Sequence, residues 1–165
     1  LLHDVGKPMT TRQEGNDWVA PSHSTKGTLL VRYILWKEFG MCGTPELQAM
    51  REAVVQLVKH HSFPPYALEK EENVRKLMSI AASAELVPDF NLKLLHLLSK
   101  ADALGRECED KDDFTAQVDL FAELAKEQGC YDGPVSFTSD FTRRAYFSGV
   151  DVWPQQELYD PLLNI

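Results

Sequence analysis

Apolar residues recur every three or four positions along most of this 165-residue chain, and this spacing constrains the fold more than any other feature. It is typical of one buried helix face, whereas the alternation in twos that marks a half-buried strand is almost absent. The pattern predicts six helices, near residues 25–39, 44–61, 74–81, 90–104, 114–125 and 138–147. We therefore expect an all-α helical bundle, with one small hairpin-like insertion that turns at Gly15 and Asn16.

Two of these helices carry specific predictions about burial. The helix over residues 25–39 has apolar residues around most of its circumference, so we expect it to be largely buried. For residues 90–104 we expect the inner face to hold Leu94, Leu97, Leu98 and Ala101. The helix over residues 44–61 should begin with Thr44 as its N-cap and end in two histidines, because two prolines soon follow.

The length of the chain favours one domain, which we place at residues 1–150. Residues 151–165 read as an extended, proline-punctuated segment or linker. The chain opens inside an apolar run, without an initiator Met or a helix cap, so we expect that residues are missing from its N-terminus.

Composition narrows the class of protein. The net charge of −8 disfavours binding to long nucleic acid through a broad electrostatic field, so a polyanionic substrate must be held locally by metal ions or a few basic side chains. The three cysteines are odd in number and far apart, which favours reduced thiols. No apolar run approaches the roughly 20 residues of a membrane span. We expect a soluble, cytoplasmic protein without a membrane partner.

The strongest local motif is His3-Asp4, at the end of an apolar run and close to Gly6. Where a helix unwinds near a glycine, the two neighbouring side chains can converge on one ion. Imidazole nitrogen and carboxylate oxygen together suit divalent Fe, Mn, Co, Ni or Zn. Taken alone, the pair also fits a capping Asp beside an ordinary His.

Further ligand types occur later in the chain, at His23, His60, His61 and Asp102. Asp102 follows a leucine-rich helix, and burying its carboxylate without a partner is costly. A cation solves that problem, and a salt bridge to Arg106 at i+4 is the alternative. His96 lies six residues before Asp102 on the same helix, so it should point away from Asp102.

These motifs resemble the HD superfamily of metal-dependent phosphohydrolases: LLHDVGKP at the start, then His23, the pair His60-His61, and KADALGR around Asp102. The resemblance covers residues 1–106 and is strongest to the HD domains of tRNA nucleotidyltransferase-like and RNA-end-processing proteins. It implies an HD-domain helical bundle with one or two divalent ions, from among Mn, Fe, Ni, Co, Mg and Zn. The family's pattern begins with a further His, which would precede residue 1.

The resemblance also implies roles for individual residues. The implied metal ligands are His3, Asp4, His23, His60 and Asp102. The implied substrate contacts are Lys7, His23, His61 and Arg106. For the adjacent histidines, helical period places His61 on the apolar face, whereas the family usually uses the first of the pair, and we favour His60 as the ligand.

The chemistry that such a site supports is hydrolysis at phosphorus, with Asp4, Lys7 and Asp102 in catalytic roles. We expect a phosphodiesterase or phosphomonoesterase that acts on nucleotides, or on RNA ends presented by a flanking domain. One alternative is a non-catalytic module of the same fold that senses ligands or binds partners. Another is a nucleoside triphosphate hydrolase, which would need more basic residues around the pocket than this chain offers.

Overall fold

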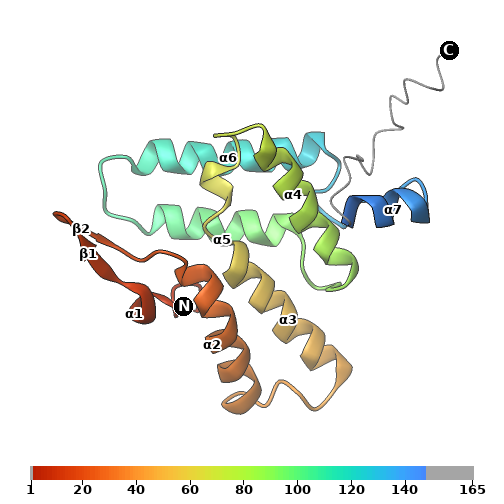
Figure 1. Ribbon diagram of the computed structural model, residues 1–165, viewed down its shortest axis with the longest axis horizontal. Helices are drawn as coiled ribbons and strands as arrows, with labels where there is room; N and C mark the ends of the chain where they lie inside the picture. The colour runs from red at the N-terminus through yellow and green to blue at the C-terminus, as the bar shows by residue number, and fades with distance from the viewer. Residues whose placement is uncertain (1, 148–165) are drawn as a thin grey trace.

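The computed structural model describes residues 2–147, and this part of the chain is mostly helical (Figure 1). The predicted segment at residues 151–165 lies outside the described residues. The α-helices are α1 (Lys7–Thr10), α2 (His23–Lys37), α3 (Pro45–His60), α4 (Glu72–Ala82), α5 (Leu92–Leu104), α6 (Lys111–Glu127) and α7 (Asp140–Phe147), and the 3₁₀ turns are η1 (Pro64–Tyr66) and η2 (Ser83–Glu85). The prediction of an all-α class is confirmed.

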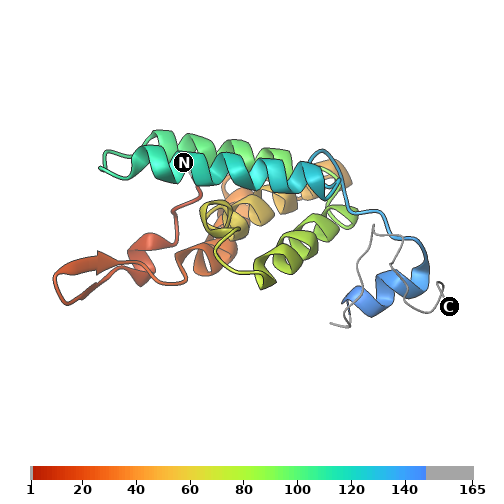
Figure 2. The same ribbon diagram turned by 90° about the horizontal axis from the view of Figure 1, so that it is seen from above.

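The predicted hairpin is present. Strands β1 (Arg12–Glu14) and β2 (Asp17–Val19) pair antiparallel, and within residues 2–147 they form the one sheet. Gly15 takes a φ of +63°, which a side chain would disfavour, and so permits the tight turn. The hairpin extends away from the helices, at the left of Figures 1 and 2.

Local capping explains why the helix bounds agree with the sequence pattern to within a few residues. The Thr44 side chain accepts a hydrogen bond from the backbone N–H of Leu47, and Asn91 does the same for Leu94 at the start of α5. Gly40 and Gly129, just beyond α2 and α6, both have a φ of +64°. Left-handed glycines of this kind end helices without steric cost.

The helices form two packed groups. Helices α5 and α6 lie side by side and antiparallel, with α4 against them, and they bury a cluster that includes Leu77, Leu95 and Phe121 (Figure 1). Helices α2 and α3 form a second antiparallel pair around Val31 and Val58. Contacts between α3 and α5 join the two groups. The end of α3 therefore lies where the groups meet.

Two burial predictions were wrong. Helix α2 buries only Gly27, Val31 and Leu35, and 67% of Leu29 is exposed. Its main neighbours are α1 and α3, which cover a single face. Helix α5 buries Leu92, Leu95, His96, Ser99 and Ala103, whereas Leu94, Leu97 and Ala101 are exposed. Because leucine occupies so many positions of α5, its periodicity alone did not select the inner face.

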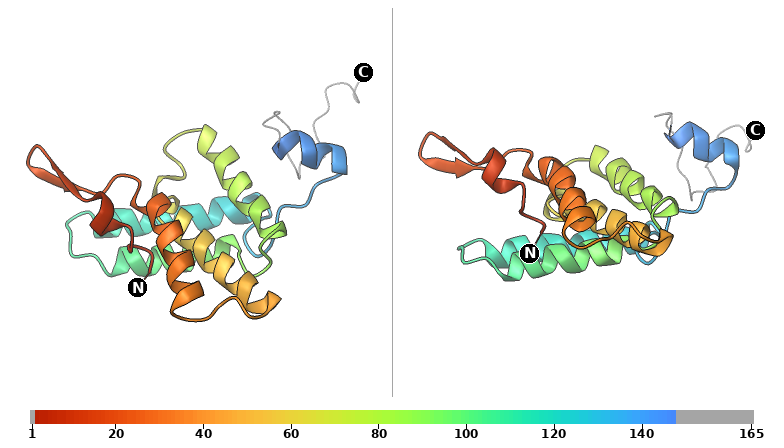
Figure 3. Two further views of the ribbon diagram at one scale, coloured as in Figure 1. Left: turned by 60° about the horizontal axis from the view of Figure 1, so that its bottom comes forward. Right: turned by 90° about the horizontal axis from the view of Figure 1, so that it is seen from below.

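Helix α7 lies at the opposite end of the molecule from the hairpin (Figure 3). An ion pair between Arg143 Nε and Glu85 Oε2, 2.9 Å apart, connects it to η2. Cys42 and Cys108 are exposed thiols and Cys130 is a buried one. Within residues 2–147, every helix is too short or too polar to cross a membrane.

The aromatic core of α6 provides a stability test. Phe121 is fully buried and its ring meets Phe63 edge-on at 6.2 Å, whereas Phe141 of α7 is 78% exposed. Phe121→Ala should lower the free energy of unfolding by about 3–5 kcal/mol, because it leaves a cavity. Phe141→Ala should change it by less than about 0.5 kcal/mol. Urea unfolding followed by circular dichroism measures both, and similar losses in the two variants would contradict this packing.

Candidate metal centre

A turn before α1 carries His3 and Asp4, and a glycine lets this turn approach α2 closely. Gly6 is buried, and a Cβ at this position would overlap the backbone carbonyl of His23, the first residue of α2. The backbone N–H of Lys7 donates to the Asp4 carbonyl at 2.9 Å, which closes the turn. Asp4 is thereby placed beside the side chain of His23.

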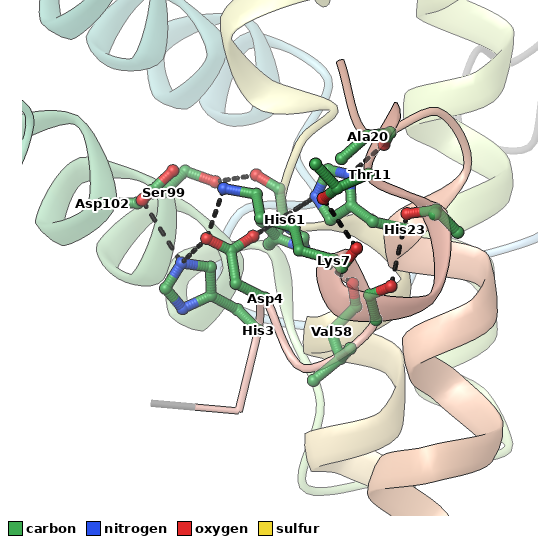
Figure 4. Close-up of polar contacts among 12 residues, drawn as sticks. His3, Asp4, Lys7, Thr11, Ala20, His23, Val58, His61, Ser99 and Asp102 are labelled. Carbon is green, nitrogen blue, oxygen red and sulfur yellow. Dashed lines mark hydrogen bonds and ion pairs between the residues drawn. The ribbon is translucent and has the colours of Figure 1, made fainter. Parts of the chain in front are cut away.

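The Asp4 carboxylate lies at the centre of the site (Figure 4). Its Oδ1 is 3.4 Å from His23 Nε2 and 3.6 Å from His61 Nε2. Its Oδ2 is 3.4 Å from His3 Nε2 and 2.6 Å from Lys7 Nζ. Three imidazole rings, from the first turn, the start of α2 and the end of α3, therefore converge on one carboxylate.

Helix α5 adds a second carboxylate. Asp102 Oδ1 lies 3.3 Å from His3 Nε2, and Asp102 Oδ2 accepts a hydrogen bond from Arg106 Nη2 at 3.2 Å. The salt bridge to Arg106 is thus present together with the approach to the histidine. Ser99, one turn earlier, donates its hydroxyl to the His61 carbonyl at 2.6 Å. This bond joins the end of α3 to α5 and helps to hold His61 in place.

Backbone carbonyls determine which ring nitrogens carry protons. His23 Nδ1 lies 2.8 Å from the Ala20 carbonyl oxygen, and His61 Nδ1 lies 2.8 Å from that of Val58. A carbonyl oxygen can only accept, so each Nδ1 must donate its proton, and the neutral ring leaves Nε2 with a bare lone pair. The two Nε2 atoms are 3.2 Å apart. Two lone pairs at that distance repel unless a proton or a cation lies near both.

The donor set fits a divalent ion. Ligand atoms of His3, Asp4 and His61 all lie within 4.8 Å of one another. Ligating histidines typically donate their other nitrogen to a carbonyl or carboxylate, which is the arrangement of His23 and His61. Nitrogen and carboxylate oxygen together favour Mn, Fe, Co, Ni or Zn over Ca, which prefers an all-oxygen shell.

The protonation states suit metal binding as well. Burial acts to raise the pKa of Asp4, but the hydrogen bond from Lys7 and the nearby positive charges outweigh it, so the net pKa is lowered. Burial lowers the pKa of His61, and the neighbouring histidines add to this effect. At neutral pH the carboxylate is therefore charged and the His61 ring neutral, as ligands must be.

His60, which was predicted as a metal ligand, lies elsewhere. Consecutive residues of a helix point about 100° apart, so only one of the two histidines can face Asp4, and the structure selects His61. The His60 ring packs near Phe90, with 6.5 Å between centroids. Burial, together with the charges of Lys59 and Lys76, lowers its pKa to about 4.

Of the other predicted residues, all but His3 line one small cavity. A space of about 120 Å³ is lined by Asp4, Lys7, His23, His61, Asp102 and Arg106. Sequence reasoning missed the remaining lining residues, among them Ser62, Tyr66 and Phe114. The first two follow α3 at a point where the prolines indicated only that the helix must end. Phe114 was assigned to a helix face without any link to the site.

His96 is a second buried histidine, outside this cluster. Its Nδ1 lies 2.8 Å from the Tyr131 hydroxyl, and its Nε2 lies 3.2 Å from Asp119 Oδ1, which Lys100 also contacts. The hydrogen bond from Lys100 lowers the pKa of Asp119. This network ties α5 to α6 and to the chain after α6, a structural use that agrees with placing His96 apart from Asp102.

Comparisons with protein-family models, with curated proteins and with solved structures find no match to this chain. The case for a function therefore depends on the site's own residues and geometry.

The close approach at Gly6 can be tested with a matched glycine. Gly6→Ala should lower the free energy of unfolding by about 2–3 kcal/mol, because the new methyl group overlaps the His23 backbone. It should also weaken Mn²⁺ binding, since α2 must shift away from Asp4. Gly43→Ala is the control, because a Cβ there meets nothing within 4 Å. Urea unfolding and Mn²⁺ titration measure both effects, and equal behaviour of the two variants would refute the contact.

The lowered pKa of His60 predicts that the stability of the fold depends on pH. The folded state lowers the pKa of His60 from 6.5 to about 4, so the unfolded chain binds the proton first and stability falls as the pH drops through this window. Since the ring is partly exposed, we expect the wild type to lose about 2 kcal/mol more than His60→Gln between pH 6.5 and pH 4. Urea unfolding at several pH values measures the difference, and parallel stability curves would contradict it.

Proposed function

We propose that this chain is a metal-dependent phosphohydrolase of the HD type that acts on nucleotide or RNA-end phosphates. The observation that carries the proposal is that the Nε2 atoms of His23 and His61 lie 3.2 Å apart and that both face the Asp4 carboxylate. When both rings are neutral, with each Nδ1 donating to a carbonyl, the two Nε2 atoms repel each other unless a cation lies near both. A divalent cation removes this repulsion and is attracted by both carboxylates of the site.

We assign the ligands as follows. His3, Asp4, His61 and Asp102 would hold the principal ion, with His61 in the position first given to His60. His23 would complete this site or serve a second ion. The ion would be Mn, Fe, Co, Ni, Zn or Mg, and when bound it supplies Lewis acidity toward a phosphate oxygen and toward water.

Two cations of the chain line the same cavity. Lys7 is half-exposed beside Asp4, and Arg106 is half-exposed beside Asp102. Each can turn from its carboxylate toward a phosphate oxygen and offset the charge that develops there. Asp4 and Asp102 accept hydrogen bonds and so can orient the attacking water. In the reaction the water oxygen bonds to phosphorus, the ester P–O bond breaks, and the leaving oxygen takes a proton to become an alcohol.

A non-catalytic module with the same fold is the competing hypothesis. Such a module would retain the helices and their caps but has no physical need for convergent ligands. The half-exposed cations at the mouth of the cavity also favour an anionic substrate over a purely structural ion.

The adjacent histidines give a matched pair for testing the site. After loading with Mn²⁺, elemental analysis should find one or two ions per wild-type chain. His61→Gln should weaken metal binding by about 10-fold or more, whereas His60→Gln should retain the metal, because its ring lies near Phe90. Equal metal content in the two variants would contradict the ligand assignment.

Hydrolysis tests the activity. The Mn²⁺-loaded wild type should hydrolyse p-nitrophenyl phosphate or its bis ester, and Asp4→Asn should lower kcat/KM at least about 100-fold. Asp132→Asn is the control, because this exposed carboxylate pairs with Lys93 outside the site. A wild type that binds metal without hydrolysing any phosphate ester would favour the non-catalytic module.

A further inference from the structure

A larger cavity opens next to the metal centre. Its volume is about 460 Å³, and it shares Ser62 and Tyr66 with the smaller cavity around Asp4. His60 lines the larger cavity and His61 lines the smaller one. The two spaces are therefore neighbours at the end of α3, with Ser62 and Tyr66 as their common wall.

The lining of the larger cavity suits an anion. Three lysines, Lys59, Lys70 and Lys76, surround it together with two glutamates, Glu69 and Glu72. Within residues 2–147, no ion pair shorter than 4 Å joins any of these lysines to either glutamate. The lining has an excess of positive charge, in a chain whose net charge is −8. The lysines of this cavity attract an anion locally, and this attraction opposes the repulsion of the anion by the negative charges on the rest of the surface.

Neutral hydrogen-bond donors accompany the lysines. Ser24, Thr25 and Ser62 line the same space, and hydroxyl and ammonium donors together are the usual partners of phosphate oxygens. Lys76 Nζ lies 4.7 Å from the centre of the Phe63 ring, which restrains its position. Burial is the first cause of the low pKa of His60, and the charges of Lys59 and Lys76 are the others.

An aromatic side chain lines both spaces at their common wall. Tyr66 is 46% exposed, and its ring meets Phe114 edge-on at 6.1 Å. An exposed aromatic face of this kind can stack against a nucleobase, an interaction worth about 1–3 kcal/mol per base. A group that connects the two cavities must pass it.

We propose that the substrate carries a second phosphate, separated from the reacting phosphate by a sugar, and that this second phosphate occupies the lysine-lined cavity while the nucleoside passes Tyr66. The substrate class is then a nucleoside bisphosphate or the phosphorylated end of an oligonucleotide. This inference rests on the proposed function. Directly linked phosphates share one oxygen, whereas two spaces with Ser62 and Tyr66 between them suit phosphates that are joined through a spacer.

Three nucleotides test the inference: adenosine 3′,5′-bisphosphate, AMP and ADP. In the Mn²⁺-loaded wild type, KM for the bisphosphate should be about 10-fold below that for AMP. Lys59→Gln combined with Lys70→Gln should raise KM for the bisphosphate about 10-fold and change KM for AMP less than about twofold. The control combines Lys37→Gln and Lys126→Gln, which remove the same charge from side chains paired with Trp36 and Glu123.

Equilibrium binding separates the failure of this inference from failure of the proposed function. Calorimetric titration of the Mn²⁺-loaded protein with the bisphosphate requires no turnover. It should show a roughly 10-fold loss of affinity for the bisphosphate in the variant that combines Lys59→Gln and Lys70→Gln, the cavity variant, and no loss in the control variant. Equal binding by the cavity variant and the control variant would overturn the inference. If ADP binds as tightly as the bisphosphate, with the same dependence on the lysines, the sugar spacing is wrong. If the bisphosphate binds in a lysine-dependent way but no nucleotide is hydrolysed, the proposed function is contradicted and the phosphate site in the larger cavity is supported.

Discussion

The contact on which the site depends is the approach of Gly6 to the backbone of His23. Without a side chain at residue 6, the first turn can lie against the start of α2, and the Asp4 carboxylate comes within 3.4 Å of the His23 ring. The hydroxyl of Ser99 then holds the end of α3 against α5, which brings His61 to the same carboxylate. Segments far apart in the sequence meet at one point because two short-range contacts fix them.

The position of the site within the fold has an energetic reason. Polar groups gather where the α2–α3 pair meets the α4–α6 group, at the border between the two apolar clusters. Placing them inside either cluster would remove their hydration and cost several kcal/mol for each charge. At the border, burial keeps His61 neutral, while Lys7 and Arg106 remain half-exposed. Shielded imidazoles and half-exposed cations thus line one small cavity.

Much of the fold could be predicted from the sequence, because caps, glycines and three-four periodicity are local properties. The hairpin at Gly15 and the start of α3 at Thr44 follow from such rules. The inner face of α5 does not follow from such rules, since its leucines allow several faces and packing against α6, α3 and η1 selects one. The choice of His61 over His60 likewise depends on how α3 packs against α5, although its helical period did favour His61. Tyr66 could not be linked to the site, because the turn that carries it has no periodicity.

The two adjacent histidines show how one helix end can serve two tasks. His61 is held by a carbonyl on one nitrogen and faces a carboxylate with the other, and burial keeps the ring neutral, which is the state that the proposed cation requires. His60 is kept neutral beside the cationic Lys59 and Lys76, so it adds no further charge to the larger cavity. Because charges on the surface are screened beyond about 8 Å at physiological salt, the net charge of −8 does not decide what binds in these cavities. Binding of the proposed anionic substrate would be decided by the few cations within hydrogen-bond reach, and these line two neighbouring cavities at the end of α3.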